Sequence, residues 1–248
     1  MFSPRLLSKL KEAEAVTVLT GAGVSAESGV PTFRGKDGIW GKFKPEDLAS
    51  VNAFMNNPDL VWEWYKHRKQ IIASIKPNLG HVALVEMEHL YKRFAIVTQN
   101  IDNLHRRAGS KTVYELHGNI ERNYCMGCGK YFTNEEILRQ ERSPRCQFCN
   151  NLIRPDVVWF GEMLPEDEWN KSIRATELAD VFFSIGTSAI VYPAASLPMI
   201  AKQSGAYLVE INLEPTDLSA YADEVLLGES GNILPRLLEA YRHPHTIS

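Results

Sequence analysis

The sequence lacks any long hydrophobic run. None of its apolar segments approaches the roughly 20 residues that a membrane-spanning helix requires, although apolar residues make up 44% of the chain. Residues 1–16 are amphipathic, without the apolar centre and cleavage pattern of a secretory signal peptide. We therefore expect a cytoplasmic protein that does not bind a membrane.

Cysteine and excess charge are also scarce. The 248 residues include four cysteines, and the net charge is −3. This mildly acidic chain lacks the basic excess that is typical of nucleic-acid binders, so no nucleic-acid partner is expected. In a reducing cytoplasm the cysteines should be thiolates rather than disulfides.

Strand-like and helix-like segments alternate along the chain. Short apolar runs typical of buried strands lie at residues 16–19, 94–98, 157–160, 181–185, 207–211 and 224–227. Helical patterns lie between most of them, at residues 81–91, 166–177 and 194–203. This alternation predicts an α/β fold with a parallel sheet, in which ligands bind beyond the carboxyl ends of the strands.

Two segments interrupt the alternation. Residues 37–78 are rich in aromatic residues and mostly helical in pattern, and residues 121–155 carry all four cysteines. We interpret them as a helical module and a metal-binding module that together form a smaller domain. The large domain then consists of residues 1–36, 79–120 and 156–248.

The cysteines form two Cys-x-x-Cys pairs, Cys125 with Cys128 and Cys146 with Cys149. A spacer of this length allows a hairpin that joins the pairs into one tetrahedral site. Four thiolate ligands leave no open position for a substrate, so the predicted zinc ion is structural. Two disulfides or four free thiols remain the alternative.

A glycine turn follows the first apolar run. Gly21-x-Gly23-x-x-Ala26 is a weak match to the dinucleotide-binding fingerprint, in which backbone N–H groups approach a phosphate. The segment continues into Pro31-Thr32-Phe33-Arg34-Gly35, which is foreign to that fingerprint.

Two further polar segments suit a catalytic cleft. His117 lies between a strand-like run and the cysteine module, where a cleft between domains would form, and histidine suits proton transfer near neutral pH. Residues 98–109 place amides and a carboxylate just after a strand. A packed histidine and helix capping by Asn100 or Asp102 are the structural alternatives.

These motifs together resemble the sirtuins, the NAD-dependent protein lysine deacylases. The resemblance rests on GAGVSAESGVPTFRG, TQNIDNLHRRAG, LHGN, the paired CxxC, VVWFGE and GTS, which occur in the family order. It implies a Rossmann-type large domain, a small zinc domain, and a cleft between them that holds NAD and an acyl-lysine protein or peptide.

The resemblance also implies the roles of individual residues. His117 is the implied general base, assisted by Asn100 and Asp102. The residues implied to contact the diphosphate and riboses are Gly21, Ala22, Gly23, Ser25, Ala26, Glu27, Thr32, Phe33, Arg34 and Trp40. Those implied at the nicotinamide end are Gln99, Asn100, Ile101 and Asp102.

The remaining implied contacts lie later in the chain. The adenosine side falls on Gly186, Thr187, Ser188, Asn212, Leu213, Glu214 and Ser230. The substrate peptide falls on Val158, Trp159, Phe160, Gly161 and Glu162, which an extended peptide would join by strand addition; a purely buried strand is the alternative.

The implied reaction consumes NAD. The acyl oxygen attacks the nicotinamide ribose, nicotinamide leaves, His117 deprotonates a ribose hydroxyl, and water completes the release of amine and acyl-ADP-ribose. Rossmann dehydrogenases carry an acid about 20 residues after the glycines, where this chain has Lys42-Phe43-Lys44. This departure argues against hydride transfer and points to Asn212 or Glu214 as ribose partner.

Tyr65 and Arg68 lie three residues apart in a predicted helix and so share a face. They resemble the Tyr-x-x-Arg pair of the sirtuins that remove succinyl and malonyl groups, and Ala49 matches the small residue of that subgroup's acyl pocket. An arginine binds a carboxylate through two hydrogen bonds. The alternative is a solvated arginine between Lys66 and Lys69.

We therefore expect a monomeric deacylase for succinyl-, malonyl- and acetyl-lysine. A mono-ADP-ribosyltransferase on the same fold and a non-catalytic NAD- or peptide-binding adaptor are the competing functions.

Overall fold

The computed structural model describes residues 2–32, 44–140 and 142–243. Its largest element is a six-stranded parallel sheet with the order β3-β2-β1-β7-β8-β9. The strands are β1 (Ala15–Thr20), β2 (Arg93–Thr98), β3 (Val113–Glu115), β7 (Val181–Ile185), β8 (Tyr207–Asn212) and β9 (Glu224–Leu227). The predicted α/β fold with a Rossmann-type parallel sheet is confirmed.

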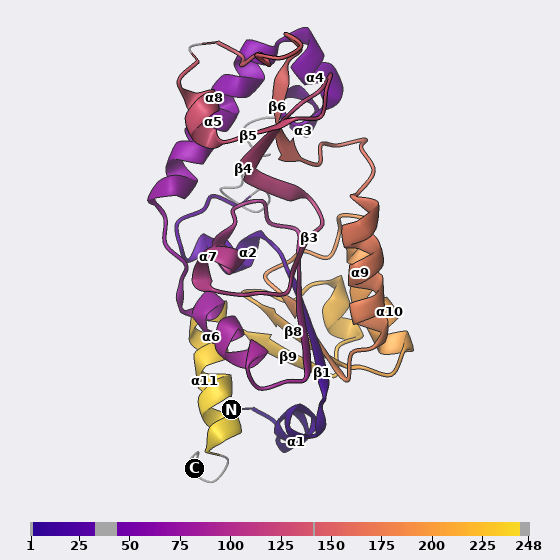
Figure 1. Cartoon of the computed structure of the whole chain (residues 1–248). Helices are drawn as coiled ribbons and strands as arrows, with labels where there is room; N and C mark the ends of the chain where they lie inside the picture. Colours follow the sequence, from indigo (N-terminus) through magenta and orange to yellow (C-terminus); the bar gives the residue numbers. More distant parts are fainter. Residues whose placement is uncertain (1, 33–43, 141, 244–248) are drawn as a thin grey trace.

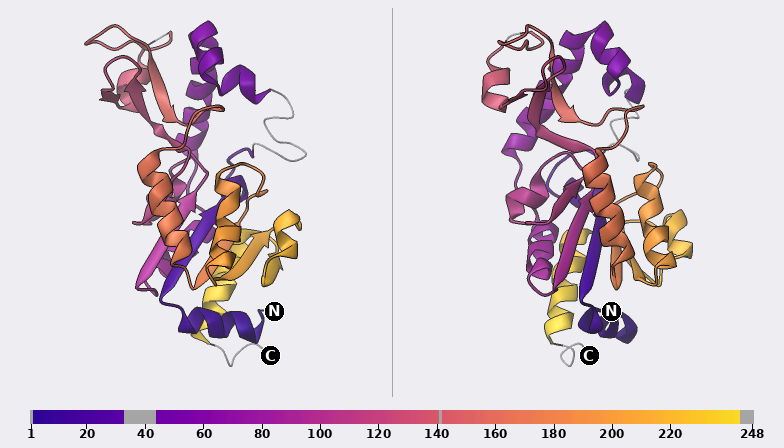
Figure 2. Two further views of the ribbon diagram at one scale, coloured as in Figure 1. Left: turned by 90° about the vertical axis from the view of Figure 1, so that its right-hand side faces the viewer. Right: turned by 45° about the vertical axis from the view of Figure 1, so that its right-hand side comes forward.

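Helices cover both faces of this sheet (Figures 1 and 2). On one face pack α1 (Pro4–Glu12), α6 (Leu79–Glu88) and α11 (Ser230–Arg242), and on the other α9 (Glu166–Glu177), η2 (Ala194–Ser196) and α10 (Leu197–Gln203). Side chains of a strand alternate between faces, so Val18 joins the first layer and Leu19 the second. Every residue of β1 is therefore buried, as its unbroken apolar pattern indicated.

A smaller module lies beyond the carboxyl ends of the strands, at the top of Figure 1. It contains a three-stranded antiparallel sheet in the order β5-β4-β6. Its elements are α3 (Pro45–Leu48), α4 (Val51–Asn56), α5 (Pro58–Ser74), β4 (Gly118–Cys125), β5 (Tyr131–Phe132), α8 (Asn134–Leu138) and β6 (Ile153–Val157). Phe54, Trp62 and Trp159 are at most 1% exposed and lie in one apolar cluster that joins the helical and cysteine-bearing segments.

One predicted strand is wrong. Residues 157–160 do not form a strand of the parallel sheet: β6 ends at Val157 and pairs antiparallel with β4. Of the apolar residues 158–160 only Trp159 is buried, and it packs into the small module, whereas Phe160 is exposed. An apolar run of this length does not specify which sheet it joins.

The other elements differ from prediction mainly at their ends. The predicted helix at 81–91 begins at Leu79 because the Asn78 side chain caps it, and residues 194–203 divide into η2 and α10. β4 and β6 each continue across a predicted domain boundary. None of the helices in the described part of the chain combines the length and apolarity that a membrane crossing requires.

Candidate active site

A cleft of about 740 Å³ lies where the large sheet meets the small module. The chain leaves β1 for β2 on one side and later enters β7 on the other, so this is the switch point at which α/β sheets bind ligands. The predicted site residues that line it are Gly21, Ala22, Gly23, Thr32, Tyr65, Gln99, Asn100, Ile101, His117, Val158, Trp159, Phe160, Gly161, Glu162, Gly186, Thr187, Ser188, Asn212, Leu213 and Glu214.

Three glycines form part of the cleft wall from bare main chain. Gly21 N donates to Ile185 O at 3.0 Å, and Gly23 N donates to Gly186 O at 2.8 Å. A Cβ on Gly23 would lie 2.7 Å from Gly186 Cα, and one on Gly186 would lie 2.5 Å from Val24 N. Only glycine allows the turn after β1 to approach the turn after β7 this closely. The absence of side chains at these positions also leaves room for a ligand against the backbone.

The glycine turn leads into the short helix α2 (Ala22–Ala26), whose C-cap residue is Glu27. Ser25 is fully buried, and Ala26 is half-buried. Glu27 accepts from Ser230 Oγ at 2.8 Å and from Gly231 N at 3.0 Å, which joins α2 to the first turn of α11. None of these four predicted contact residues lines the cleft in the described structure.

The segment after β2 is held against the glycine turn by its amides. Asn100 Nδ2 donates to Gly21 O at 2.9 Å and to Ser25 Oγ at 3.2 Å. Gln99 Nε2 donates to Thr187 Oγ1 at 3.0 Å. Both amides therefore join loops that follow different strands.

Asp102 is 4% exposed and does not line the cleft. Its Oδ1 accepts from Leu104 N at 2.9 Å, at the start of α7 (Leu104–Ala108), but the N-cap position of that helix is Asn103. Burial raises the pKa of Asp102, and the hydrogen bonds from Leu104 and Ser25 act against that rise.

The loops after β7 and β8 bond to each other. Asn212 Nδ2 donates to Thr187 O at 3.0 Å, and Leu213 N donates to Asn212 Oδ1 at 3.0 Å. Ser188, Leu213 and Glu214 are exposed at the cleft. These are the groups that a ligand entering from this end meets first.

His117 lies between β3 and β4 and lines the cleft half-buried. Its Nδ1 is 2.9 Å from Gln99 O, so Nδ1 carries the hydrogen and Nε2 is left to accept a proton. Burial lowers the pKa of His117, while the bond to Gln99 raises it. The neutral base form is therefore favoured at neutral pH.

The segment after β6 forms the wall next to His117. Val158 N donates to His117 O and Phe160 N to Ala49 O, both at 2.9 Å. Glu162 accepts from Trp159 N at 2.8 Å and pairs with the buried Arg154. The main-chain N–H groups of these residues already donate hydrogen bonds within the protein. An added peptide strand must therefore pair with other backbone groups of the segment.

Tyr65 and Arg68 are both buried on α5, at 2% and 5% exposure. Tyr65 lines the cleft, and its hydroxyl accepts from Trp159 Nε1 at 2.8 Å. Arg68 stacks over Trp64, another residue of the cleft wall, with its guanidinium carbon 5.0 Å from the ring. Ala49 also lines the cleft, whereas Arg68 does not and reaches it only through Trp64.

Three of the predicted NAD-contacting residues, Phe33, Arg34 and Trp40, lie outside the described residues. Cleft-lining residues that the sequence did not point to are Trp64, Leu164, Val191, Tyr192, Pro193, Pro215 and Thr216, whereas Val157 belongs to the quoted VVWFGE motif. Their only common signal is that most of them continue a predicted loop by a few residues.

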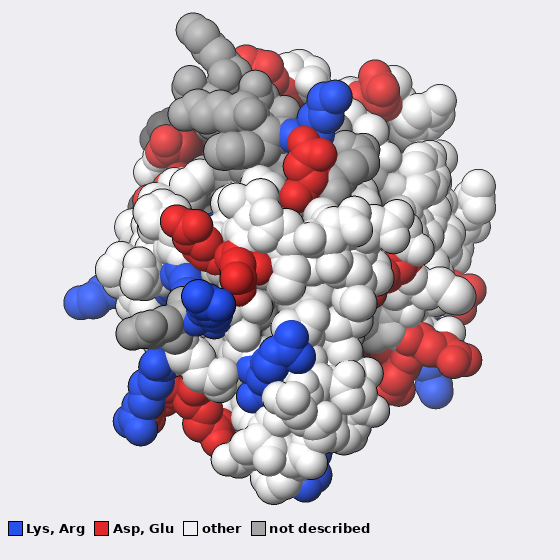
Figure 3. Space-filling model, turned by 90° about the horizontal axis from the view of Figure 1, so that it is seen from above, with Lys and Arg blue, Asp and Glu red and all other residues white. Residues whose placement is uncertain are grey.

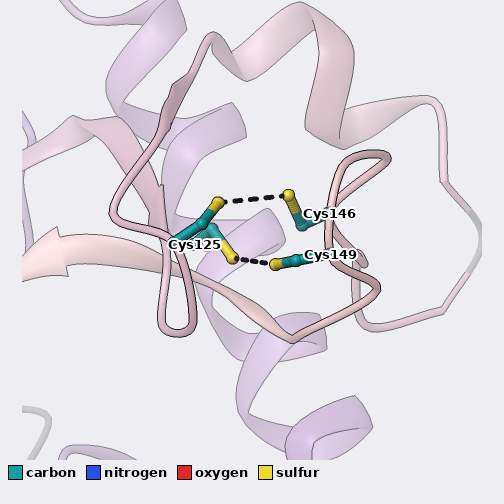
Figure 4. Close-up of side chains that lie close together, drawn as sticks. Cys125, Cys146 and Cys149 are labelled. Carbon is teal, nitrogen blue, oxygen red and sulfur yellow. Dashed lines mark hydrogen bonds between the residues drawn. The ribbon is translucent and has the colours of Figure 1, made fainter.

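The four cysteine sulfur atoms all lie within 4.8 Å of one another (Figure 4). The Sγ atoms of Cys125 and Cys149 are 3.4 Å apart, and those of Cys128 and Cys146 are 3.6 Å apart. Zinc–sulfur bonds of about 2.3 Å in a tetrahedron place sulfurs about 3.8 Å apart. The cluster thus fits one structural zinc ion, as the spacing predicted.

The surroundings of the cluster suit thiolates. Gly127 N donates to Cys125 Sγ and Phe148 N to Cys146 Sγ, each at 3.4 Å. The hydrogen bond from Asn151 N lowers the pKa of Cys149 to about 6, whereas the pKa of Cys128 is raised to about 11, because the hydrogen bond from Lys130 N, which lowers it, is outweighed by desolvation and the three neighbouring sulfur atoms. The described residues on the face of the molecule seen in Figure 3 carry basic and acidic side chains interspersed.

The comparison with protein families decides the relationship. The model of the Sir2 family matches residues 21–193 of this chain, which is more than half of it. The chain belongs to the Sir2 family. The match includes the glycine turn, His117 and all four cysteines.

Curated Sir2 relatives cover nearly the whole chain. One from Pyrococcus furiosus, named NAD-dependent protein deacylase, is 49% identical and covers 94% of this chain and 95% of its own. Another with this name, from Aquifex aeolicus, is 51% identical and covers 84% of this chain and 87% of its own.

Solved Sir2 structures share the fold. A Sir2 homologue in complex with NAD has a TM-score of 0.92 and 44% identity, covering 98% of this chain and 95% of its own. A Sir2 protein with a deacetylated peptide and an acetyl-ADP-ribose has a TM-score of 0.88 and 38% identity, covering 96% of this chain and 98% of its own.

Proposed function

We propose that this Sir2 protein removes succinyl and malonyl groups from lysine in preference to acetyl groups, which it also accepts. It is an NAD-dependent protein deacylase, like the curated relatives that it matches over most of its length. The finer preference rests on Tyr65 in the cleft wall and Arg68 buried behind it on the same helix.

The described residues at the floor of the cleft fit NAD. Main-chain atoms at Gly21, Gly23 and Gly186 leave room for a diphosphate, and Asn212 with Glu214 offers polar groups to a ribose. NAD supplies the ribose carbon that the acyl oxygen bonds as nicotinamide leaves. Phe33, Arg34 and Trp40 are proposed to complete this site.

His117 is the proposed general base. Its Nε2 accepts the proton of a ribose hydroxyl, while Nδ1 keeps its hydrogen on Gln99 O. Asn100 holds the amide segment against Gly21, which orients the groups around the reacting sugar. Asp102 and Ser25 support Asn100 from the buried side of that segment.

The acyl end of the substrate meets α5. Tyr65 accepts a hydrogen bond from Trp159 and so keeps its own hydroxyl hydrogen for donation to an acyl carboxylate. Arg68 supplies the positive charge, and the small Ala49 leaves space beside them. A guanidinium with a hydroxyl discriminates a carboxylate-bearing acyl group from a neutral one.

The test is Arg68→Met assayed with matched succinyl-, malonyl- and acetyl-lysine peptides. The loss of a charge-assisted pair predicts a fall in kcat/KM for the succinyl peptide of about 10- to 100-fold. For the acetyl peptide a change below about threefold is expected, since no carboxylate is bound. Lys76→Met, an exposed change just beyond α5, is the matched control.

Equal losses with all three peptides would rule out the carboxylate clamp. Mass spectrometry of the protein product in the same assay separates acyl removal from gain of ADP-ribose. It therefore also discriminates the deacylase from a mono-ADP-ribosyltransferase.

We further propose the domain boundaries, the cellular compartment, the oligomeric state and the partners of this enzyme. Residues 37–78 and 121–155 act as the small domain over a large domain of residues 1–36, 79–120 and 156–248. The enzyme acts as a cytoplasmic monomer on acyl-lysine proteins, without nucleic-acid or membrane partners. Thiolate ligands to zinc support a reducing compartment.

A further inference from the structure

Lys69 is a buried charged residue outside the cleft that the proposed reaction does not use. It is 4% exposed, and burial lowers its pKa to about 7, with Glu121 acting in the opposite direction. Its Nζ donates to Ile120 O and, at 2.8 Å, to Asn134 Oδ1. A buried ammonium is costly to desolvate, and these hydrogen bonds offset part of that cost.

The carbonyl that Lys69 reaches lies in an irregular stretch of the small sheet. The pairing of β4 with β6 shifts register between Asn119 and Asn123, and Ile120 falls inside that shift. A bulge disrupts the ladder locally. Lys69 therefore supplies, from another element, a donor to a buried main-chain acceptor.

Through Ile120 the contact extends to the cleft. Ile120 N donates to Ile101 O at 2.8 Å, and Ile101 lines the cleft. One peptide segment of β4 is thus bonded to α5 through its carbonyl and to the nicotinamide-side segment through its N–H. Asn134, the other acceptor, opens α8 and also accepts from Asn123 Nδ2 at 3.0 Å.

Two other polar contacts set α5 against β6 and the segment that follows it. Trp62 Nε1 donates to Ile153 O and Trp159 Nε1 to the Tyr65 hydroxyl, each at 2.8 Å. Lys69 lies one helical turn beyond Tyr65 and next to Arg68. The turn of α5 that carries Tyr65 and Arg68 is therefore held on both sides, by Trp62 and by Lys69.

We propose that Lys69 is a positioning residue. It fixes the distance of the turn of α5 that carries Tyr65 and Arg68 from the start of β4 after His117 and from Ile101 in the loop after β2. The inference rests on the proposed function, because the acyl preference is assigned to that turn. Lys69 touches neither substrate; it acts through the placement of Tyr65 and Arg68. A displacement of about 1 Å at such a turn costs up to about 100-fold in rate.

The experiment compares Lys69→Met, Lys69→Arg and the control Lys76→Met. We would measure kcat and KM separately for NAD, succinyl-lysine peptide and acetyl-lysine peptide. For Lys69→Met we expect a rise in KM for the succinyl peptide of about 10- to 100-fold. The KM for NAD should change much less than that for the peptide, because the glycine turn and the β8 loop, which hold the rest of the dinucleotide in the proposed function, make no contact with Lys69. Lys69→Arg should recover most of the loss, since it keeps charged donors.

Equal changes in the KM for NAD and for peptide, or no recovery in Lys69→Arg, would overturn the positioning role. Lys69→Gln, which loses the charge and is one atom too short to reach Ile120 O as Lys69 does, takes the place of Lys69→Met if thermal unfolding shows that the latter does not fold. The wild-type ratio of succinyl to acetyl activity tests the proposed function independently. If that ratio shows no succinyl preference, the KM for the acyl peptides must still rise relative to the KM for NAD in Lys69→Met.

Discussion

The Nδ1 atom of His117 lies 2.9 Å from the main-chain oxygen of Gln99. A carbonyl oxygen only accepts, so this contact assigns the ring hydrogen to Nδ1 and the free lone pair to Nε2. Gln99 itself bonds to Thr187 in the loop after β7. The base and two loops of the cleft are therefore placed by one connected set of hydrogen bonds.

Replacement of this base should impair chemistry and not folding. His117→Ala is expected to lower turnover of acyl-lysine peptide by about 10²–10⁴-fold, the usual contribution of a general base. The variant should keep the thermal unfolding temperature of the wild type within a few degrees, because His117 is only half-buried. Release of deacylated peptide, followed by mass spectrometry, measures the effect. His89→Ala, at an exposed position, is the control, and wild-type turnover in His117→Ala would refute the assignment.

The acid side of the pH profile should reflect the buried base. Burial lowers the pKa of His117, so the neutral form persists below the ordinary value of 6.5. We expect kcat/KM to stay near its plateau at pH 6.5 and to fall only at lower pH, as the imidazole becomes protonated. A pH series with saturating NAD checks this. A half-maximal point above the ordinary histidine value would contradict it.

The main-chain contact between the glycine loops should not tolerate a methyl group. Gly186 has φ +59 and its added Cβ would lie 2.5 Å from Val24 N. Gly186→Ala should therefore lower the free energy of unfolding by about 2–4 kcal/mol and weaken NAD binding. Gly205→Ala is the control, because Gly205 has φ +97 and no atom lies within 4 Å of an added Cβ. It measures the loss of stability from backbone strain without a steric clash. Equal effects of the two substitutions, measured by denaturant titration and calorimetry, would show that the close approach is unimportant.

Removal of zinc should unfold the small module. Structural zinc sites contribute about 10–16 kcal/mol in isolated zinc fingers, because the unfolded chain has no preformed site. Chelation of the metal, or Cys125→Ser, is expected to abolish deacylation and to lower the unfolding temperature, with metal content followed by atomic absorption. Readdition of zinc should restore activity to the chelated wild type but not to the Cys125 variant. Full activity without metal would contradict a structural role.

Stability should decline in mild acid because of a buried histidine pair. The rings of His81 and His105 lie 4.8 Å apart, and burial lowers the pKa of His81 to about 4 and that of His105 well below 6.5. The unfolded chain binds protons that the folded chain excludes, so stability present above pH 6.5 is lost as the pH falls toward 4. The shift of His81 alone corresponds to ~3 kcal/mol. Urea titrations between these pH values should show a steeper loss in wild type than in His81→Gln. The exposed His89→Gln should behave as wild type.

Much of the site was predictable because local chemistry carries it. The spacing of the paired cysteines predicts a metal site. The glycine turn can be recognised in the sequence because its glycines are needed where two main-chain segments come close together. Motifs that follow strands were placed correctly at one edge, since parallel strands bring their carboxyl ends together. Residues 157–160 were misassigned because burial alone does not reveal the partner of an apolar segment.

The sequence by itself determined the α/β class, the family, the zinc ligands and the candidate base, because each follows from residue types at short spacing. Only the tertiary structure decided the tautomer of His117, the joining of Glu27 to Ser230 across 203 residues, and the contact of Lys69 with Ile120. These depend on the distance between elements that are remote in the chain. Periodicity and motif spacing encode local geometry, whereas the packing of sheet, helices and small module sets those distances.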